Sequence, residues 1–231
     1  KRHGATSVLE YKQQGYLPSA LRNYLALLGW SNSASQQLFG YDELIAAFDL
    51  EGCQKNPATF DTVKLNWMNG EYMRKLSVSE IIKEAEPFMK AAGLDTAKGP
   101  PLDKAIALEH EKFKLLSEVP GLVDFFYKPV EYTDKAMKVL NGPGTREILL
   151  GLAERLDTLE PYLEKPIEEA VRAFVVDKGL KNGQVFHPIR SACTGRTEGP
   201  TLFLMMEVMG KKTVGERLRA AAALLQEAQK A

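Results

Sequence analysis

Apolar positions along the chain recur at intervals of three and four, the spacing that places side chains on one face of an α-helix. Residues 145–166 show this pattern most clearly. Their apolar residues predict one stripe along a single helix: Ile148, Leu152, Leu156, Leu159 and Leu163. Pro166 suits the first turn of a following helix, and Gly179 can end that helix in the left-handed conformation.

Two sequence patterns predict helix starts. Ser77 is followed three residues later by Glu80, and Thr213 is followed by Glu216. In each case the pattern has the form of a capping box, in which the two side chains bond each other's backbone N–H groups. Apolar residues at helical intervals follow both boxes.

Glycine, proline and small polar residues divide the chain into about ten predicted helices. No segment alternates strictly between apolar and polar residues, although short extended pieces around Val8 and residues 184–186 remain open. The pattern therefore predicts an all-α fold. Because a capping box opens a new helix after Leu76, we expect two modules, residues 1–76 and residues 77–231.

Composition narrows the class of protein. The 231 residues are 45% hydrophobic, which is enough to bury a core. No apolar run approaches the roughly 18 residues that a membrane span requires, so we expect a soluble, cytoplasmic protein without a membrane partner. With two cysteines, no CxxC pair and three histidines, the sequence signals neither a disulfide framework nor a metal site.

Charge is balanced overall but not locally. Lysine and arginine together number 30, as do aspartate and glutamate. Residues 178–197 contain no acid, and their basic residues are Lys178, Lys181, Arg190 and Arg196. We interpret the overlapping stretch "GQVFHPIRSACTGRTEGP", residues 183–200, as an exposed segment between two helices, able to wrap phosphates and unstacked bases. An ordinary polar connection is the alternative interpretation.

The sequence contains no recognisable set of catalytic residues. Cys193 and His187 are six residues apart across a proline, which predicts no thiol–imidazole pair without a fold. The glutamates are spread over predicted helix faces, as expected of a solvated surface. Two alternatives to nucleic-acid binding therefore stay open, a helical protein-interaction module and an enzyme with an unrecognised site.

Three long motifs resemble, in order and spacing, the C-terminal half of bacterial-type glutamyl-tRNA synthetases. They are "KRHGATSVLEYKQQGYLPSALRNYLALLGWS", "FDTVKLNWMNGEYMR" and "GQVFHPIRSACTGRTEGPTLFLMMEVMGKKTVGERL". The resemblance covers essentially the whole chain. It implies a helical stem-contact module at residues 1–76 and an α-helical anticodon-binding region at residues 77–231.

The resemblance also implies a role for the first residue. In the family, a KMSKS-type loop of the class I synthetases precedes the "HGATSV" sequence, so Lys1 would be the lysine that steadies the ATP phosphates. The Rossmann catalytic domain would lie upstream. The whole enzyme would use ATP and Mg²⁺ to join glutamate to tRNA-Glu, whereas this part alone is expected to be inactive and to bind neither cofactor.

Family positions that contact tRNA can be matched residue by residue. Arg190 matches an arginine that reaches an anticodon base. Arg196, six residues later in the basic stretch, is a further candidate for tRNA contact from composition alone. The helix-entry segment that packs against anticodon bases corresponds to Gly199, Pro200, Thr201 and Leu202. In the stem-contact module we expect Arg22 to contact phosphate or to brace local packing, and Trp67 and Met68 to lie in the core.

Lys112 departs from the family pattern. Its position matches that of an arginine which reads the third anticodon base in discriminating enzymes. A rigid guanidinium fork discriminates cytosine from guanine by geometry, whereas a lysine ammonium can rotate to suit either. We therefore expect that reading at this position is laxer, so that tRNA-Glu and tRNA-Gln are less well discriminated, or that it is shared with Arg190. A solvated helix lysine is the alternative. The family resemblance also implies a monomer.

Overall fold

The structure is a computed structural model of the chain and describes residues 7–55 and 58–228. Within these ranges there is no β-strand, and Trp30 and Cys53 form an isolated antiparallel bridge. The all-α prediction is confirmed. No helix in this part of the chain has the length and hydropathy needed to cross a membrane.

The chain forms two compact units, and it passes between them three times. Unit 1 comprises residues 1–92 and 110–121, and unit 2 comprises residues 93–109 and 122–231. These limits differ from the predicted modules, because residues 77–92 and 110–121 group with the N-terminal part. The functional boundary after Leu76 stays a prediction.

Unit 1 is built from five α-helices and two short 3₁₀ helices, among the residues described. They are α1 (Val8–Gln13), α2 (Pro18–Ala26), α3 (Tyr41–Ala47), α4 (Thr62–Lys75), α5 (Val78–Ala91), η2 (His110–Lys112) and η3 (Leu116–Glu118). Helices α2 and α4 pack together, and η2 lies against α4. Their shared core is aromatic and aliphatic and contains Tyr16, Leu21, Tyr24, Leu65 and Met68.

Two buried asparagines join the segments of unit 1. Asn69 accepts a hydrogen bond from the backbone N–H of Leu17 at 2.8 Å and donates one to the carbonyl of Lys114. Asn23 accepts from the N–H of Phe39 at 2.7 Å and donates to the carbonyl of Gln37 at 3.0 Å. Each amide therefore satisfies backbone groups that would otherwise be buried without partners.

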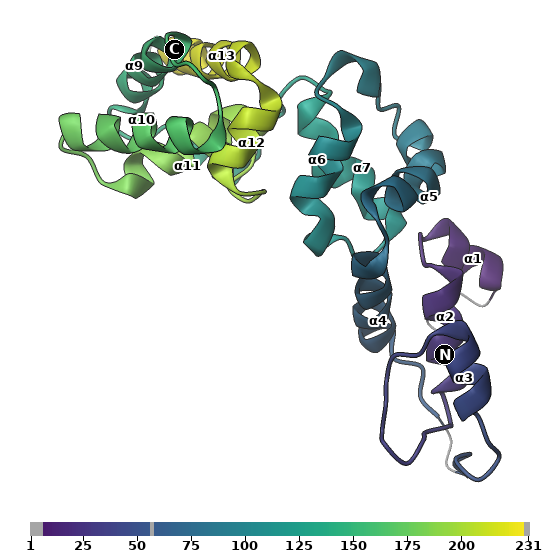
Figure 1. Cartoon of the computed structure of the whole chain (residues 1–231). Helices are drawn as coiled ribbons and strands as arrows, with labels where there is room; N and C mark the ends of the chain where they lie inside the picture. Colours follow the sequence, from purple (N-terminus) through teal and green to yellow (C-terminus); the bar gives the residue numbers. More distant parts are fainter. Residues whose placement is uncertain (1–6, 56–57, 229–231) are drawn as a thin grey trace. The chain divides into compact units, whose positions relative to one another are not determined.

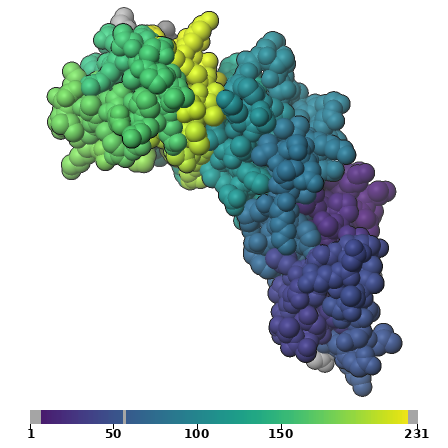
Figure 2. Space-filling model, viewed as in Figure 1, coloured from purple at the N-terminus to yellow at the C-terminus, as the bar shows by residue number. Residues whose placement is uncertain are grey.

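Unit 2 contains most of the longer helices. They are α6 (Leu102–Glu109), α8 (Asp134–Leu140), α9 (Thr145–Asp157), α10 (Glu164–Asp177), α11 (Asn182–Thr194), α12 (Leu202–Met209) and α13 (Lys211–Ala228). Shorter pieces are η1 (Thr96–Lys98) and η4 (Asp124–Phe126), and α7 (Val119–Val123) spans the border of the two units. Helices α9 and α13 lie side by side (Figure 1). In Figure 2 the yellow C-terminal helices cover one flank of the green helices α9 to α11.

One predicted helix start is confirmed and the other is wrong. Ser77 caps α5 as expected, because its hydroxyl accepts from the N–H of Glu80 and the Glu80 carboxylate accepts from the N–H of Ser77. Thr213 lies inside α13, which begins at Lys211. Gly210 supplies the break between α12 and α13, since its positive φ of 85° turns the chain there.

The predicted stripe along residues 145–166 is also only partly right. Ile148, Leu152 and Leu156 are buried on α9, but this helix ends at Asp157. Leu163 lies beyond the helix and is 50% exposed. Pro166 does lie in the first turn of α10, and Gly179 follows that helix with the predicted positive φ of 62°.

Candidate functional site

Helix α11 is the central element of unit 2 and carries Arg190, whereas Arg196 and residues 199–201 lie between α11 and α12. It contacts α8, α9, α10 and α13. Val185, Ile189 and Ala192 are fully buried and lie at helical intervals of four and three. Residues 182–194 are therefore a buried helix, and the prediction of an exposed segment at this place is wrong.

Pro188 does not interrupt this helix. It lies inside α11 and is buried, so its missing N–H removes one hydrogen bond from the helix. The apolar stripe on both sides of Pro188 packs against four other helices, and this packing holds the helix together. The open alternative of extended structure at residues 184–186 is excluded for the same reason.

The end of α11 is fixed by a close backbone approach. Gly195 has a positive φ of 73°, and a Cβ atom on it would lie 2.0 Å from the carbonyl oxygen of Glu131. The N–H of Thr133 donates to the carbonyl of Gly195 at 2.9 Å. The chain therefore leaves the helix along one path, which sets the position of the loop that follows.

Thr194 joins the two candidate arginines of this helix end. Its hydroxyl lies 2.8 Å from the carbonyl oxygen of Arg190 and 3.2 Å from that of Arg196, and accepts from the N–H of Arg196 at 3.1 Å. The Thr194 side chain is buried. The backbone positions of Arg190 and Arg196 are thus tied to one hydroxyl group.

The Arg190 side chain reaches across to the start of α12. Its Nη1 atom donates to the carbonyl oxygen of Pro200 at 2.7 Å. A Cβ atom on Gly199 would lie 3.0 Å from the same Nη1, so the absence of a side chain on Gly199 makes room for the guanidinium. Burial lowers the pKa of Arg190, and the negative charge of Glu109 opposes that shift. Glu109 is 1% exposed at the end of α6, which packs against α12.

The segment ahead of α12 presents few side chains to solvent. Pro200 and Leu202 are buried, whereas Thr201 is exposed at the N-cap of the helix. Of the segment predicted to meet anticodon bases, Thr201 and the partly exposed Gly199 are the accessible part. Leu202 instead contributes to the core of unit 2.

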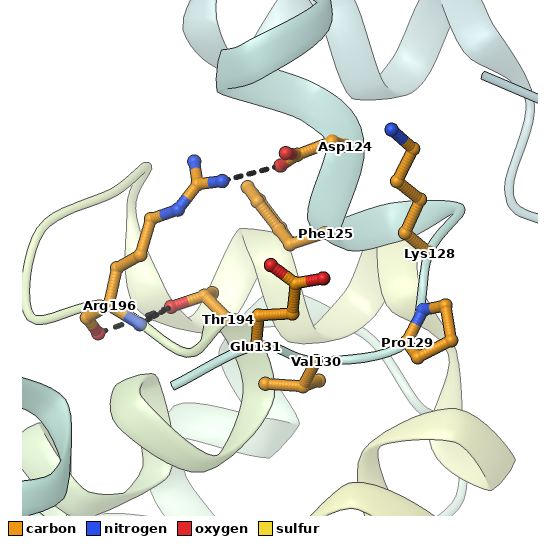
Figure 3. Close-up of a pocket in the computed structure, with 8 residues that line it drawn as sticks. All are labelled: Asp124, Phe125, Lys128, Pro129, Val130, Glu131, Thr194 and Arg196. Atoms are coloured by element: carbon orange, nitrogen blue, oxygen red, sulfur yellow. Dashed lines mark hydrogen bonds and ion pairs between the residues drawn. The ribbon is translucent and has the colours of Figure 1, made fainter. Parts of the chain in front are cut away.

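Arg196 lies beside a small pocket of about 120 Å³ (Figure 3). Its Nη2 atom is 2.6 Å from a carboxylate oxygen of Asp124, and its Cζ lies 6.0 Å from the ring centre of Phe125. Lys128 and Glu131 line the same pocket. The structure therefore brings Arg190, Arg196 and residues 199–202 together at one end of α11, which sequence spacing alone predicted only in part.

Sequence reasoning missed Asp124 and Glu109. Asp124 comes from η4, which lies against α11, and Glu109 comes from α6. Neither residue belongs to a recognisable motif, and each is more than 70 positions away from its arginine along the chain, as the 72-residue separation of Asp124 and Arg196 illustrates. Only the packing of helices reveals them.

The remaining candidates belong to unit 1. Lys112 is exposed in η2. The guanidinium of Arg22 lies over the ring of Tyr41, 4.2 Å from its centre, which favours a bracing role in the absence of RNA. Met68 is buried as predicted, but Trp67 is 43% exposed, so its assignment to the core is wrong. Lys1 lies outside the described residues.

The cysteines and acidic residues show no further centre within residues 7–55 and 58–228. Cys53 is exposed and Cys193 is buried, both as free thiols. No three His, Cys, Asp or Glu side chains of this part of the chain cluster as a metal ion would require.

Comparison with known proteins gives two family matches. A model described as the anticodon binding domain matches residues 80–222. A second model, described as the catalytic domain of class I tRNA synthetases for E and Q, matches residues 1–67.

Individual relatives cover almost all of this chain. The glutamate–tRNA ligase of Elusimicrobium minutum is 51% identical over 225 residues, which are 96% of this chain and 46% of that protein. The glutamate–tRNA ligase of Moorella thermoacetica is 42% identical over 98% of this chain and 48% of its own length. The chain therefore spans about half the length of these relatives.

A solved structure has the same fold. The crystal structure of a glutamate tRNA ligase from Elizabethkingia meningosepticum, in complex with its amino acid, superposes with a TM-score of 0.83 and is 29% identical in sequence. The match covers 93% of this chain and 43% of that chain.

Proposed function

Because the chain belongs to the anticodon-binding domain family and is homologous to the glutamate–tRNA ligases, we propose that it is the tRNA-recognising half of such a ligase. It binds the stem and the anticodon of tRNA-Glu, so that the catalytic part of the longer ligase can attach glutamate. Residues 1–76 serve as the stem-contact module, and residues 77–231 serve as the anticodon-binding region.

One contact carries this proposal, the hydrogen bond of 2.7 Å from Arg190 to the carbonyl of Pro200. It holds the loop between α11 and α12 against the helix and gathers Arg190, Gly199 and Thr201 on one surface. A guanidinium has five N–H donors in a planar arrangement. An arginine that donates one of them to a protein carbonyl therefore still has donors for RNA.

The exposed part of this surface suits single-stranded RNA. Anticodon bases are unstacked, and proteins recognise such bases through hydrogen bonds to their edges and through stacking on planar groups. Arg190 supplies a planar donor group, and Gly199 lets the backbone approach a base closely. The hydroxyl of Thr201 adds a group that can both donate and accept.

Unit 1 offers contacts of a different kind. Arg22 is exposed on α2 and is supported by the ring of Tyr41. A supported cation at the surface attracts phosphate without reading sequence. In this proposal Arg22 therefore positions the tRNA, whereas the loop between α11 and α12 reads it.

The chemistry belongs to the longer ligase. There Lys1 would hold the ATP phosphates, and ATP with Mg²⁺ would supply the activation of glutamate. The described residues of this chain bind and orient the tRNA. In this proposal the protein works in the cytoplasm, where translation takes place, and acts as a monomer.

Lys112 bears on the choice between tRNA-Glu and tRNA-Gln. Its exposure on η2 leaves room for an RNA base, and its ammonium can rotate to suit cytosine or guanine. We expect the full-length ligase to accept tRNA-Gln to a measurable extent. A strong preference for tRNA-Glu that persists in Lys112→Ala contradicts this part of the proposal.

Titration of labelled tRNA-Glu with the 231-residue chain tests the proposed function. Saturable binding should weaken as salt rises, because bound phosphates release counterions, and should weaken further when the anticodon is replaced. Absence of binding even at low salt would favour a protein-interaction module. An affinity that does not change when the anticodon is replaced would indicate that the chain contacts only the stem.

A further inference from the structure

We propose that Arg196 and Asp124 act together to bind the hydrogen-bonding edge of an unstacked nucleobase, and that neither contacts a phosphate. This inference rests on the proposed binding of tRNA and assigns a ligand class to the pocket in Figure 3. It makes Asp124, from η4, a residue of the RNA-binding surface.

The contacts of Arg196 with its neighbours fix the orientation of its guanidinium. Asp124 is 2.6 Å from Nη2 of Arg196, while Thr194 holds the backbone N–H of the same residue at 3.1 Å. The ring of Phe125 lies beneath the guanidinium at 6.0 Å. Held at both its backbone and its side chain, Arg196 presents its planar group in one orientation, as base recognition requires.

Both members of the pair remain accessible. The side chain of Arg196 is 35% exposed and that of Asp124 is 28% exposed. The surface therefore offers a donor and an acceptor next to each other. A base edge carries donors and acceptors in the same close arrangement, whereas a phosphate at neutral pH carries acceptors only.

The charges of the residues that line the pocket also favour a base over a phosphate. The pocket is lined by two acids, Asp124 and Glu131, and by two bases, Lys128 and Arg196. The formal charges cancel, so the pocket exerts little net attraction on a phosphate. An approaching phosphate would also be repelled by Asp124, which touches the arginine that would bind it. A neutral base meets no such repulsion.

The effect of Asp124→Asn distinguishes a base from a phosphate. If Arg196 contacted a phosphate, removal of the neighbouring negative charge would strengthen binding of every RNA. If the pair binds a base edge, the same substitution replaces one of the two acceptor oxygens by an NH2 donor and removes the charge that holds Arg196, so binding weakens. The two interpretations therefore predict changes of opposite sign.

The experiment measures the affinity of the 231-residue chain for tRNA-Glu and for transcripts in which each anticodon-loop base is replaced in turn. We expect Asp124→Asn and Arg196→Lys each to weaken binding of the unaltered transcript about tenfold, which is the scale of one specific base contact. Both variants should lose discrimination at the same single base. Asp124→Glu should restore part of that discrimination, which a purely structural role would not explain.

A second ion pair provides the matched control. Arg172 and Glu168 on α10 are also 2.6 Å apart, and their side chains are 50% and 36% exposed. Arg172→Lys and Glu168→Gln should leave both affinity and discrimination unchanged. The slope of affinity against salt should also stay unchanged in Arg196→Lys and Asp124→Asn, since neither alters a phosphate contact.

Three results would overturn the inference. Tighter binding of all transcripts by Asp124→Asn would show a phosphate contact, as would a uniform loss with a salt slope reduced by about one in Arg196→Ala. Unchanged discrimination in both Asp124→Asn and Arg196→Lys would exclude a base contact. If the unaltered chain binds no tRNA, the proposed function itself fails, an outcome distinct from these three.

Discussion

Nη1 of Arg190 lies 2.7 Å from the carbonyl oxygen of Pro200, ten residues further along the chain. This hydrogen bond closes the loop between α11 and α12, and a buried carboxylate, that of Glu109, acts on the same guanidinium. Arg190 therefore has a structural task in addition to the proposed contact with RNA. Its substitution is expected to affect stability as well as binding.

Replacement of Arg190 by methionine keeps the length of the aliphatic part of the side chain but removes the guanidinium and all its hydrogen-bond donors. We expect unit 2 to lose about 3 kcal/mol of unfolding free energy, because Glu109 remains buried without its positive neighbour. Urea unfolding followed by circular dichroism measures this loss. The double variant Arg190→Met with Glu109→Gln should lose less than Arg190→Met alone; an equal or larger loss would show that Glu109 does not depend on this arginine. Arg172→Met, at an exposed position, serves as the control.

Gly195 and Gly179 both have positive φ, yet they differ in their surroundings. A Cβ atom on Gly195 would lie 2.0 Å from the backbone oxygen of Glu131, while nothing lies within 4 Å of one on Gly179. We expect Gly179→Ala to cost about 1 kcal/mol through backbone strain alone. Gly195→Ala should cost roughly 3 kcal/mol or more, because the backbone must also move. Equal losses in chemical unfolding would mean that the loop after α11 adapts freely.

Asn69 is expected to be critical for unit 1. Its replacement by alanine leaves the buried N–H of Leu17 and the carbonyl of Lys114 without their partner, at a cost of about 2 to 3 kcal/mol. Hydrogen exchange at the amide of Leu17 should accelerate accordingly. Asn182→Ala, at an exposed position on α11, should change stability by less than about 0.5 kcal/mol. Unchanged protection of Leu17 in Asn69→Ala would contradict the prediction.

The buried thiol of Cys193 predicts a loss of stability at alkaline pH. Burial raises the pKa of Cys193 from 9.0 to about 12. Between these values the unfolded chain releases a proton that the folded chain retains, so stability falls as pH rises through this window. The contribution approaches about 1.4 kcal/mol per pH unit.

Unfolding in urea at pH 8 and pH 10 tests this dependence. Cys193→Ala should flatten the decline between the two pH values, whereas Cys53→Ala, at the exposed thiol, should leave it unchanged. A thiol reagent should modify Cys53 but not Cys193 in the folded chain. Modification of both thiols at equal rates would show that Cys193 is accessible.

Local patterns in the sequence were sufficient for the fold class and for several helix ends. Ser77 and Glu80 are three residues apart, and their capping box depends on nothing else. Thr213 and Glu216 have the same spacing, but Gly210 starts the helix earlier, because a glycine with positive φ provides a stronger break than a side-chain cap. Local signals of this kind compete, and the sequence does not say which of them prevails.

The region around Pro188 shows a second limit. Basic composition suggested an exposed segment, whereas the stripe of Val185, Ile189 and Ala192 was present in the sequence and is typical of a helix. Packing of this stripe against four helices outweighs the hydrogen bond that Pro188 cannot make. The composition of a segment was therefore a poorer guide than its periodicity.

The candidate site was predictable to the extent that its residues are neighbours in sequence. Arg190, Arg196 and residues 199–202 lie within thirteen positions, and a motif can include them all. Asp124 and Glu109 reach the arginines through contacts between helices, so no local pattern contains them. The distinction between a free arginine and one held by a carboxylate is thus a property of the fold.

The three passages of the chain between its two compact units have a practical consequence for dissecting the protein. Unit 1 is completed by residues 110–121, since the N–H of Leu116 donates to the carbonyl of Gly15 at 2.9 Å and the hydroxyl of Ser117 donates to the carbonyl of Gln14 at 2.7 Å. A single cut after residue 76 or residue 92 removes these partners from the N-terminal piece. An autonomous N-terminal unit therefore requires residues 110–121 to be joined to it through a short linker, in place of residues 93–109.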